Sequence, residues 1–386
     1  MSILNDSGTL VSRADTHAAT PLVNSNQIVA LDVVRALAAL IVFLGHVRIV
    51  CFTPWESLAT EYKTLGATLF YAVARFGQEA VLVFFVLSGF FVGGQLVTRL
   101  RAQRFNVSDY AIDRATRLLV PLAPACALTL FVGWVTTGDL ADAPNILGAA
   151  FGLNGILVET SAYNLPLWSI AFEIWFYIAA GAFAALLNDR ASPVAFALTL
   201  ASVIVFSVLN VAFFAFWLAG ASIFVWRERL RHPAILVAGA VLVLMSSVLF
   251  EIHDAGPAVM ARDKAIYWQA LICLGFALMI PCLAGARVNA VLQPVARVSA
   301  FMAASSYSLY VFHYPLLMLI SLYVPQVKTF GPAAVAQFAL ISFATFGLCW
   351  SLWFVFERQT DPVRRWAKRA IANLSTSPVA ARSTPA

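Results

Sequence analysis

The sequence predicts an all-α membrane protein: a polytopic helical bundle of about ten transmembrane helices with both termini in the cytoplasm. Its 386 residues are 61% hydrophobic and only 11% charged, whereas a soluble domain carries roughly 25% charged residues. Apolar stretches close to the ~20 residues that span a bilayer recur along the whole chain. Open sheets are excluded because hydrocarbon cannot satisfy their backbone groups, and these stretches lack the alternation of a membrane barrel.

The order of polar and apolar segments predicts three regions. Residues 1–28 are polar and lack the features of a cleavable signal peptide, so we expect a disordered cytoplasmic tail. Residues 29–357 form the membrane domain, and residues 358–386 a basic cytoplasmic tail. The stretch from Pro193 to Trp226 is too long for one crossing, so we divide it near Asn210 into two short helices. The other spans lie near 29–50, 78–97, 118–137, 166–187, 234–250, 266–285, 301–323 and 333–356.

Basic residues orient this bundle, because cytoplasmic loops carry the excess of lysine and arginine. With both termini inside, most basic residues fall on the cytoplasmic side. Those left in outer loops are Lys63, Arg75, Arg262, Lys264 and Lys328. The formal charge of +6 therefore reflects membrane topology, and we expect membrane lipid but no nucleic acid as a partner.

The five cysteines predict neither a metal site nor a disulfide framework. Cys126, Cys273, Cys282 and Cys349 fall within apolar spans, and Cys51 lies at an outer boundary. Their spacing fits no ligand pattern, so we interpret them as buried apolar thiols.

Within the first predicted span, residues 31–46 contain three ionisable residues, Asp32, Arg35 and His46. Such a residue near a bilayer centre costs about 2.5–3.5 kcal/mol on insertion scales. Arg35 and His46 share one helix face about 16 Å apart, and Asp32 is spaced to pair with Arg35. Arg35 alone is also explained by snorkelling to the headgroups, but the shared face favours a functional site.

Two further polar residues are predicted at a similar depth in the outer half of the membrane. Glu173 lies about two turns into the fourth span, and His313 lies just past the middle of the ninth. With His46 they predict a buried polar cavity. The alternative is that such residues only join helices by hydrogen bonds.

The second span ends with Ser88 among closely spaced glycines, which let membrane helices approach one another. Helix packing explains this segment about as well as function does. Arg114 and Arg117 follow on one face next to the membrane. Residues of this kind usually determine topology, and they would also suit a phosphate-bearing ligand from the cytoplasm.

Together these segments resemble acyltransferase family 3, integral membrane proteins that acylate envelope polysaccharides and related acceptors. The resemblance runs from about Leu31 to Glu357 and departs from the family pattern at Gly77–Ala80 and in "FERQTDP". It implies no fused esterase-like domain and a place in the bacterial inner membrane. The motifs that carry it are Arg35-x10-His46, "FFVLSGF" (84–90), "RATRLLVP" (114–121), "LWSIAFEIWFY" (167–177) and "SYSLYVFHYP" (306–315).

The resemblance implies transfer of an acyl group, most often acetyl, from a cytoplasmic acyl-CoA donor to a sugar hydroxyl, with no permanently bound cofactor. A neutral imidazole suits the base that must take the hydroxyl proton, so His46 is the predicted general base and Glu173 the residue that orients it. Arg35 stays protonated and is predicted to bind the donor or stabilise the transition state. Arg114 and Arg117 would bind CoA phosphates, and Ser88, Tyr310 and His313 are the predicted substrate contacts.

A proton-coupled transporter or a glycolipid flippase is the alternative, because buried Arg, Glu and His also mark transport pathways. The sequence contains neither a duplicated half nor paired broken helices, which weighs against this class. The acceptor is open between a polymer, a macrolide, a lipid-linked glycan and a cyclic glucan.

Overall fold

The computed structural model describes residues 28–189, 191–253 and 265–376. Within these ranges the chain is helical, and its only β-type pairings are two isolated bridges. Parts of the expected tails 1–28 and 358–386, namely residues 1–27 and 377–386, lie outside the described residues, as do the outer-loop residues Arg262 and Lys264.

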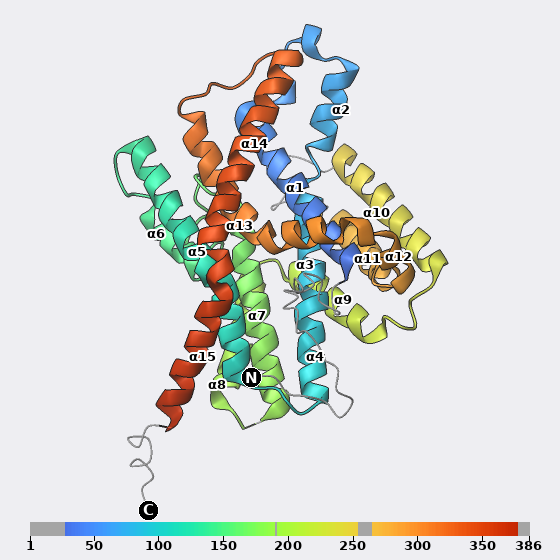
Figure 1. The fold of residues 1–386 in the computed structure, drawn as a ribbon, viewed down its shortest axis with the longest axis vertical. Coiled ribbons are helices and arrows are strands. Elements are labelled where there is room, and N and C mark those ends of the chain that lie inside the picture. The colour runs from blue at the N-terminus through green and yellow to red at the C-terminus, as the bar shows by residue number, and fades with distance from the viewer. Residues whose placement is uncertain (1–27, 190, 254–264, 377–386) are drawn as a thin grey trace, which may run out of the picture.

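Figure 1 shows the helices packed as an elongated bundle, with α10 and α11 on one side and α5 and α6 on the other. The long helices are α1 (Val29–Cys51), α5 (Val107–Thr137), α7 (Leu167–Asn188), α10 (Pro233–His253), α11 (Ala265–Leu283), α13 (Ala296–Ser321) and α14 (Pro332–Val355). The shorter elements are η1 (Trp55–Ser57), η2 (Thr60–Tyr62), α2 (Leu65–Val73), α3 (Gly77–Ser88), η3 (Gly89–Gly93), α4 (Gly94–Arg101), α6 (Ala143–Ala150), α8 (Pro193–Val208), α9 (Val211–Trp226), α12 (Ala286–Val291), η5 (Gln293–Val295), η6 (Glu357–Gln359) and α15 (Thr360–Thr376).

Seven helical segments of the described chain are long and apolar enough to cross a membrane. The multi-pass character predicted from composition is therefore supported. A helix occupies each predicted span, but α8 and α9 are short, and α13 is not among the seven segments. The exact number of ten crossings and the cytoplasmic location of the termini stay predictions.

The division of the long apolar stretch at Asn210 is confirmed. Helix α8 ends at Val208 and α9 begins at Val211. The Asn210 side chain accepts a hydrogen bond of 3.0 Å from the Ala212 N–H, which makes it the N-cap of α9. Each helix has 16 residues, or about 24 Å, less than the ~30 Å of a hydrocarbon core.

Helix α13 is polar because protein surrounds much of it. Ser306, Ser308 and His313 are all buried, and their helix packs against α1, α5 and α14. A helix in this position faces other helices more than lipid, so its serines, tyrosines and histidine find partners inside the bundle. This explains why it is less apolar than its neighbours.

The glycines of the second predicted span serve close helix packing. Helix α3 passes through a π-helical stretch, η3, into α4, and α9 crosses this joint. A Cβ atom at Gly89 would lie 1.8 Å from the carbonyl oxygen of Trp217, and one at Gly220 would lie 2.0 Å from that of Val86. Such backbone approach requires glycine at both positions. Packing therefore accounts for Gly89.

The predicted basic tail after the last span contains α15, which packs on α5. Lys368 Nζ lies 2.9 Å from a carboxylate oxygen of Asp113 and 3.0 Å from one of Asp109. Arg99 approaches Asp113 from α4 at 3.2 Å. In Figure 1, α14 and α15 follow one another along one side of the bundle.

Candidate active site

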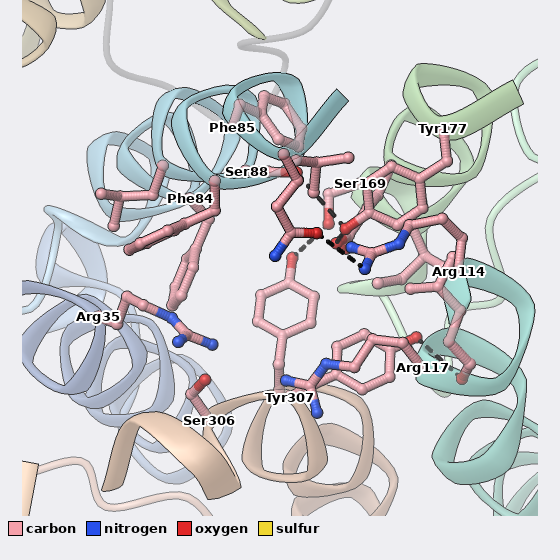
Figure 2. A pocket seen from close by; sticks show the side chains of 18 of the residues that line it. Arg35, Phe84, Phe85, Ser88, Arg114, Arg117, Ser169, Tyr177, Ser306 and Tyr307 are labelled. Carbon is pink, nitrogen blue, oxygen red and sulfur yellow. Dashed lines mark hydrogen bonds between the residues drawn. The ribbon is translucent and has the colours of Figure 1, made fainter. Parts of the chain in front are cut away.

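A polar cavity of about 420 Å³ lies between α1, α3, α4, α5, α7, α13 and α15. It brings together most of the residues singled out in the sequence, although they come from five separate helices. Figure 2 shows the side chains of Arg35, Arg114 and Arg117 around this space. The predicted site residues that line it are Arg35, Ser88, Arg114, Arg117, Glu173 and Tyr310.

The arginines of the cavity differ in how their charge is compensated. Arg117 forms an ion pair with Glu357, whose other carboxylate oxygen accepts hydrogen bonds from the N–H (2.9 Å) and hydroxyl (2.6 Å) of Ser308. Arg35 lies 3.9 Å from Asp32, as its spacing predicted. This long contact leaves the Arg35 guanidinium with capacity for another anion.

Glu173 is part of a hydrogen-bonded chain across the cavity wall. The Tyr177 hydroxyl donates to Glu173 Oε1 at 2.5 Å. Ser88 lies 3.5 Å from the same hydroxyl and accepts a bond of 3.2 Å from the Trp217 indole N–H. These hydrogen bonds fix the carboxylate within a wall that also contains Arg35, Arg114, Arg117 and Arg364.

His46 and His313 lie beyond the cavity and bind each other. Nδ1 of His46 and Nε2 of His313 are 2.9 Å apart, and the rings stack with centroids 5.0 Å apart. Glu173 accepts its hydrogen bond from Tyr177, whereas the hydrogen-bond partner of His46 is His313. His313 thus holds His46 in the position that was expected for Glu173, and a role of Glu173 in orienting His46 stays a prediction. Sequence depth alone could not reveal which helices touch, and α1 packs on α13.

The hydrogen bonds determine which nitrogen carries each proton. Nδ1 of His313 lies 2.7 Å from the carbonyl oxygen of Leu309. A carbonyl only accepts, so this Nδ1 carries hydrogen, and the neutral ring has a lone pair at Nε2. His46 must then donate through its Nδ1, which leaves its Nε2 unprotonated. The arrangement is that of a base held by a second residue.

Tyr310 connects the cavity with the histidine pair. Its hydroxyl lies 2.7 Å from the Ser169 hydroxyl and donates at 3.2 Å to the carbonyl oxygen of Pro166. Its ring packs edge-on against His313, with centroids 6.2 Å apart. A ligand that reaches the Tyr310 end of the cavity therefore lies next to the residue that holds His46.

Tyr177, Trp217 and Glu357 contribute to the site but escaped prediction from the sequence. Glu357 is 4% exposed despite its position at the end of an apolar span. A carboxylate at the end of the last apolar span, in a sequence that also has arginines within or next to its spans, is the pattern that could have indicated an ion pair. Tyr177 and Trp217 resemble ordinary aromatic residues of a span, and the sequence contains no such signal for them.

Among the described residues, no group of three or more His, Cys, Asp or Glu side chains could hold a metal ion. The cysteines of these residues are free thiols, and all but Cys282 are buried. The polar groups that line the cavity are arginines, tyrosines, serines, Gln95 and the carboxylates of Asp32, Asp113 and Glu173.

The family model described as an acyltransferase domain matches residues 28–354, nearly the whole chain. The chain belongs to acyltransferase family 3. The match contains each of the predicted site residues, whereas Glu357 and the cavity residue Arg364 lie beyond it. No curated protein and no solved structure matches the chain. As a family member with several membrane-type helices, it is a multi-pass integral membrane protein.

Proposed function

We propose that the protein is a membrane O-acyltransferase. It takes an acyl group, acetyl in the simplest case, from cytoplasmic acyl-CoA and transfers it to a hydroxyl of a cell-envelope or exported carbohydrate. The bacterial inner membrane is the proposed location. The observation that carries the proposal is the hydrogen bond between His46 and His313 beside a cavity lined by arginines, from which we infer that Nε2 of His46 is unprotonated.

In this proposal the acceptor oxygen attacks the thioester carbonyl carbon while its proton passes to Nε2 of His46. The bond between carbonyl carbon and sulfur breaks, and CoA leaves as a thiolate that recovers the proton from His46. His313 accepts a hydrogen bond from Nδ1 of His46 throughout, which stabilises the imidazolium formed between the two steps.

The cavity supplies the electrostatics of this reaction. Arg35 and Arg117 keep their positive charge at any working pH and suit the donor phosphates or the oxyanion of the transition state. The planar guanidinium can donate two parallel hydrogen bonds to such oxygens, whereas a lysine ammonium cannot. Ser88 and Tyr310 are the proposed contacts of the substrates within the cavity.

Purified protein incubated with acetyl-CoA tests this function directly. We expect release of free CoA, increased by a suitable acceptor and lost in His46→Ala. Mass spectrometry of envelope glycans with and without the gene would identify the acceptor. A protein that neither binds nor cleaves acyl-CoA, while it moves protons or glycolipids across vesicle membranes, would instead be a transporter or flippase.

A further inference from the structure

A second, apolar groove of about 630 Å³ runs between α5, α7 and α8. It adjoins the polar cavity, because Arg114, Leu118 and Tyr177 line both. Elsewhere its walls are mostly apolar, with residues such as Ala115 and Ile178. The groove is therefore a hydrocarbon-lined extension of the polar cavity.

The groove opens toward the side of the bundle. Val107, Leu119, Phe151 and Val194 line it and are all exposed. In a multi-pass protein, exposed apolar side chains on spanning helices face lipid. A ligand that uses this opening reaches the cavity from the membrane rather than from water.

Arg114, at the junction, differs from the other cavity arginines, Arg35, Arg117 and Arg364, each of which lies within 4 Å of a carboxylate. No ion pair within 4 Å joins it to a carboxylate in the described part of the chain, and its one hydrogen bond is a 3.5 Å contact to Gln95. Its Nε is buried without a partner. Its guanidinium packs over the rings of Tyr110 and Tyr177, 6.0 and 5.6 Å from their centroids. A half-buried cation that forms no such ion pair favours an anionic ligand.

The site thus presents an apolar groove, then a guanidinium that lacks an anion, then a polar cavity that ends near the histidine pair. We propose that it binds the acceptor as a carbohydrate carried on a lipid phosphate. The hydrocarbon chain lies in the groove, the phosphate at Arg114 and the sugar in the cavity, with a hydroxyl directed toward Tyr310. This inference rests on the proposed function and names its substrate class.

The order of the three parts distinguishes this ligand from the donor. In acyl-CoA the phosphates and the acyl group stand at opposite ends of the polar pantetheine arm. Acyl-CoA therefore has no hydrocarbon chain directly next to a phosphate that could fill the apolar groove. In a lipid-phosphate sugar the phosphate joins the chain to the sugar directly. Arg114 is thereby assigned to the acceptor, which leaves Arg35, Arg117 and Arg364 for the donor.

The test uses decyl phosphate, a ten-carbon chain joined to a phosphate, as probe of the full chain in detergent. It compares the wild type with Arg114→Gln, which removes the cation, and Ala115→Trp, which fills the groove. Ala197→Trp is the matched control, because Ala197 is exposed on α8 and does not line the groove. Unfolding temperatures without ligand establish that each variant is folded.

We expect decyl phosphate to stabilise the wild type and Ala197→Trp alike, and to bind at least tenfold more weakly to Arg114→Gln and Ala115→Trp. Inorganic phosphate and decanol should not reproduce the effect. Acetyl-CoA affinity should stay unchanged in Ala115→Trp, and decyl phosphate should not displace acetyl-CoA.

Equal binding to all four proteins would overturn the proposal. Displacement of acetyl-CoA by decyl phosphate would also overturn it, because the groove and Arg114 would then serve the donor. Failure of the proposed function has a different signature, namely a wild type that does not cleave acetyl-CoA. The decyl phosphate titration still tests the site in that case.

Discussion

His46 and His313 stand 267 positions apart in the sequence, yet their imidazoles share a hydrogen bond of 2.9 Å. The rings are not equivalent. His313 is anchored by its other nitrogen to the backbone of its own helix, whereas the second nitrogen of His46 has no hydrogen-bond partner in the part of the chain that the structure describes. One ring is therefore suited to act as a base and the other to hold it.

Replacing the two histidines should have unequal effects on transfer. We expect His46→Ala to lower the rate by about 10²–10⁴-fold, the usual contribution of a general base. His313→Ala should cost less, because the base remains but loses its orientation. CoA release by purified variants of similar unfolding temperature measures both. A His46→Ala protein that keeps most of its turnover would make His313 the candidate base.

Donor binding should separate Arg35 from His46. Arg35→Lys keeps the positive charge but loses the bidentate hydrogen bonding of the guanidinium, so the affinity for acyl-CoA should fall severely. His46→Ala should leave the affinity within a few-fold, because a base acts mainly in the transition state. Calorimetric titration with acyl-CoA decides between them. If His46→Ala lost acyl-CoA binding while Arg35→Lys bound acyl-CoA normally, the roles assigned to the two residues would be reversed.

The Arg117–Glu357 pair should contribute strongly to stability. Removing one member of a fully buried pair costs about 3–5 kcal/mol, because the other charge stays behind unpaired. The side chain of Glu357 is 2% exposed and that of Arg117 is 33% exposed, so water partly screens the charge that remains and the cost is smaller. Glu357→Gln should therefore lower the unfolding temperature clearly. Glu228→Gln is the control, since Glu228 is 67% exposed and pairs with Arg231 at the surface. Similar small shifts in both variants would contradict a structural role of Glu357.

Close packing at the π-helical joint predicts a large effect from one methyl group. Gly89→Ala would place its Cβ 1.8 Å from the Trp217 carbonyl oxygen, so α9 must move and the protein should be destabilised. Gly347→Ala, where a Cβ meets nothing within 4 Å, should be harmless. The unfolding temperatures of the two variants measure this difference. Equal unfolding temperatures would mean that the helices at the π-helical joint can move apart to accept a methyl group.

Topology can be tested by cysteine labelling in a background without the native thiols. With both termini inside, Arg104→Cys in the loop after α4 should react only with reagents that reach the cytoplasm. Asp139→Cys, at the start of a loop without lysine or arginine through Tyr163, should react from outside. Both side chains are exposed. A reversed pattern would contradict the predicted topology and, with it, the proposed access of the donor from the cytoplasm.

Hydropathy and spacing predicted the helical class, the division at Asn210 and the side chains around the cavity. These features depend on local properties, namely apolar length, a capping residue and the helical periodicity that put Arg35 beside Asp32. Pairing between distant helices was not predictable in the same way. Glu173 and His313 were both expected in the outer half of the membrane. Depth alone does not determine that His313 hydrogen-bonds to His46 while Glu173 hydrogen-bonds to Tyr177.

The partner of Arg117 follows it by 240 residues, which has a consequence for biosynthesis. During synthesis α5 enters the membrane long before Glu357 has been made. Until then the guanidinium of Arg117 must keep water or lipid phosphate as its counter-ion. The polar cavity is therefore completed only when the last membrane helix has been inserted. A chain that stalls before residue 357 should be a poorly folded target for membrane proteases, even though it contains every motif of the family.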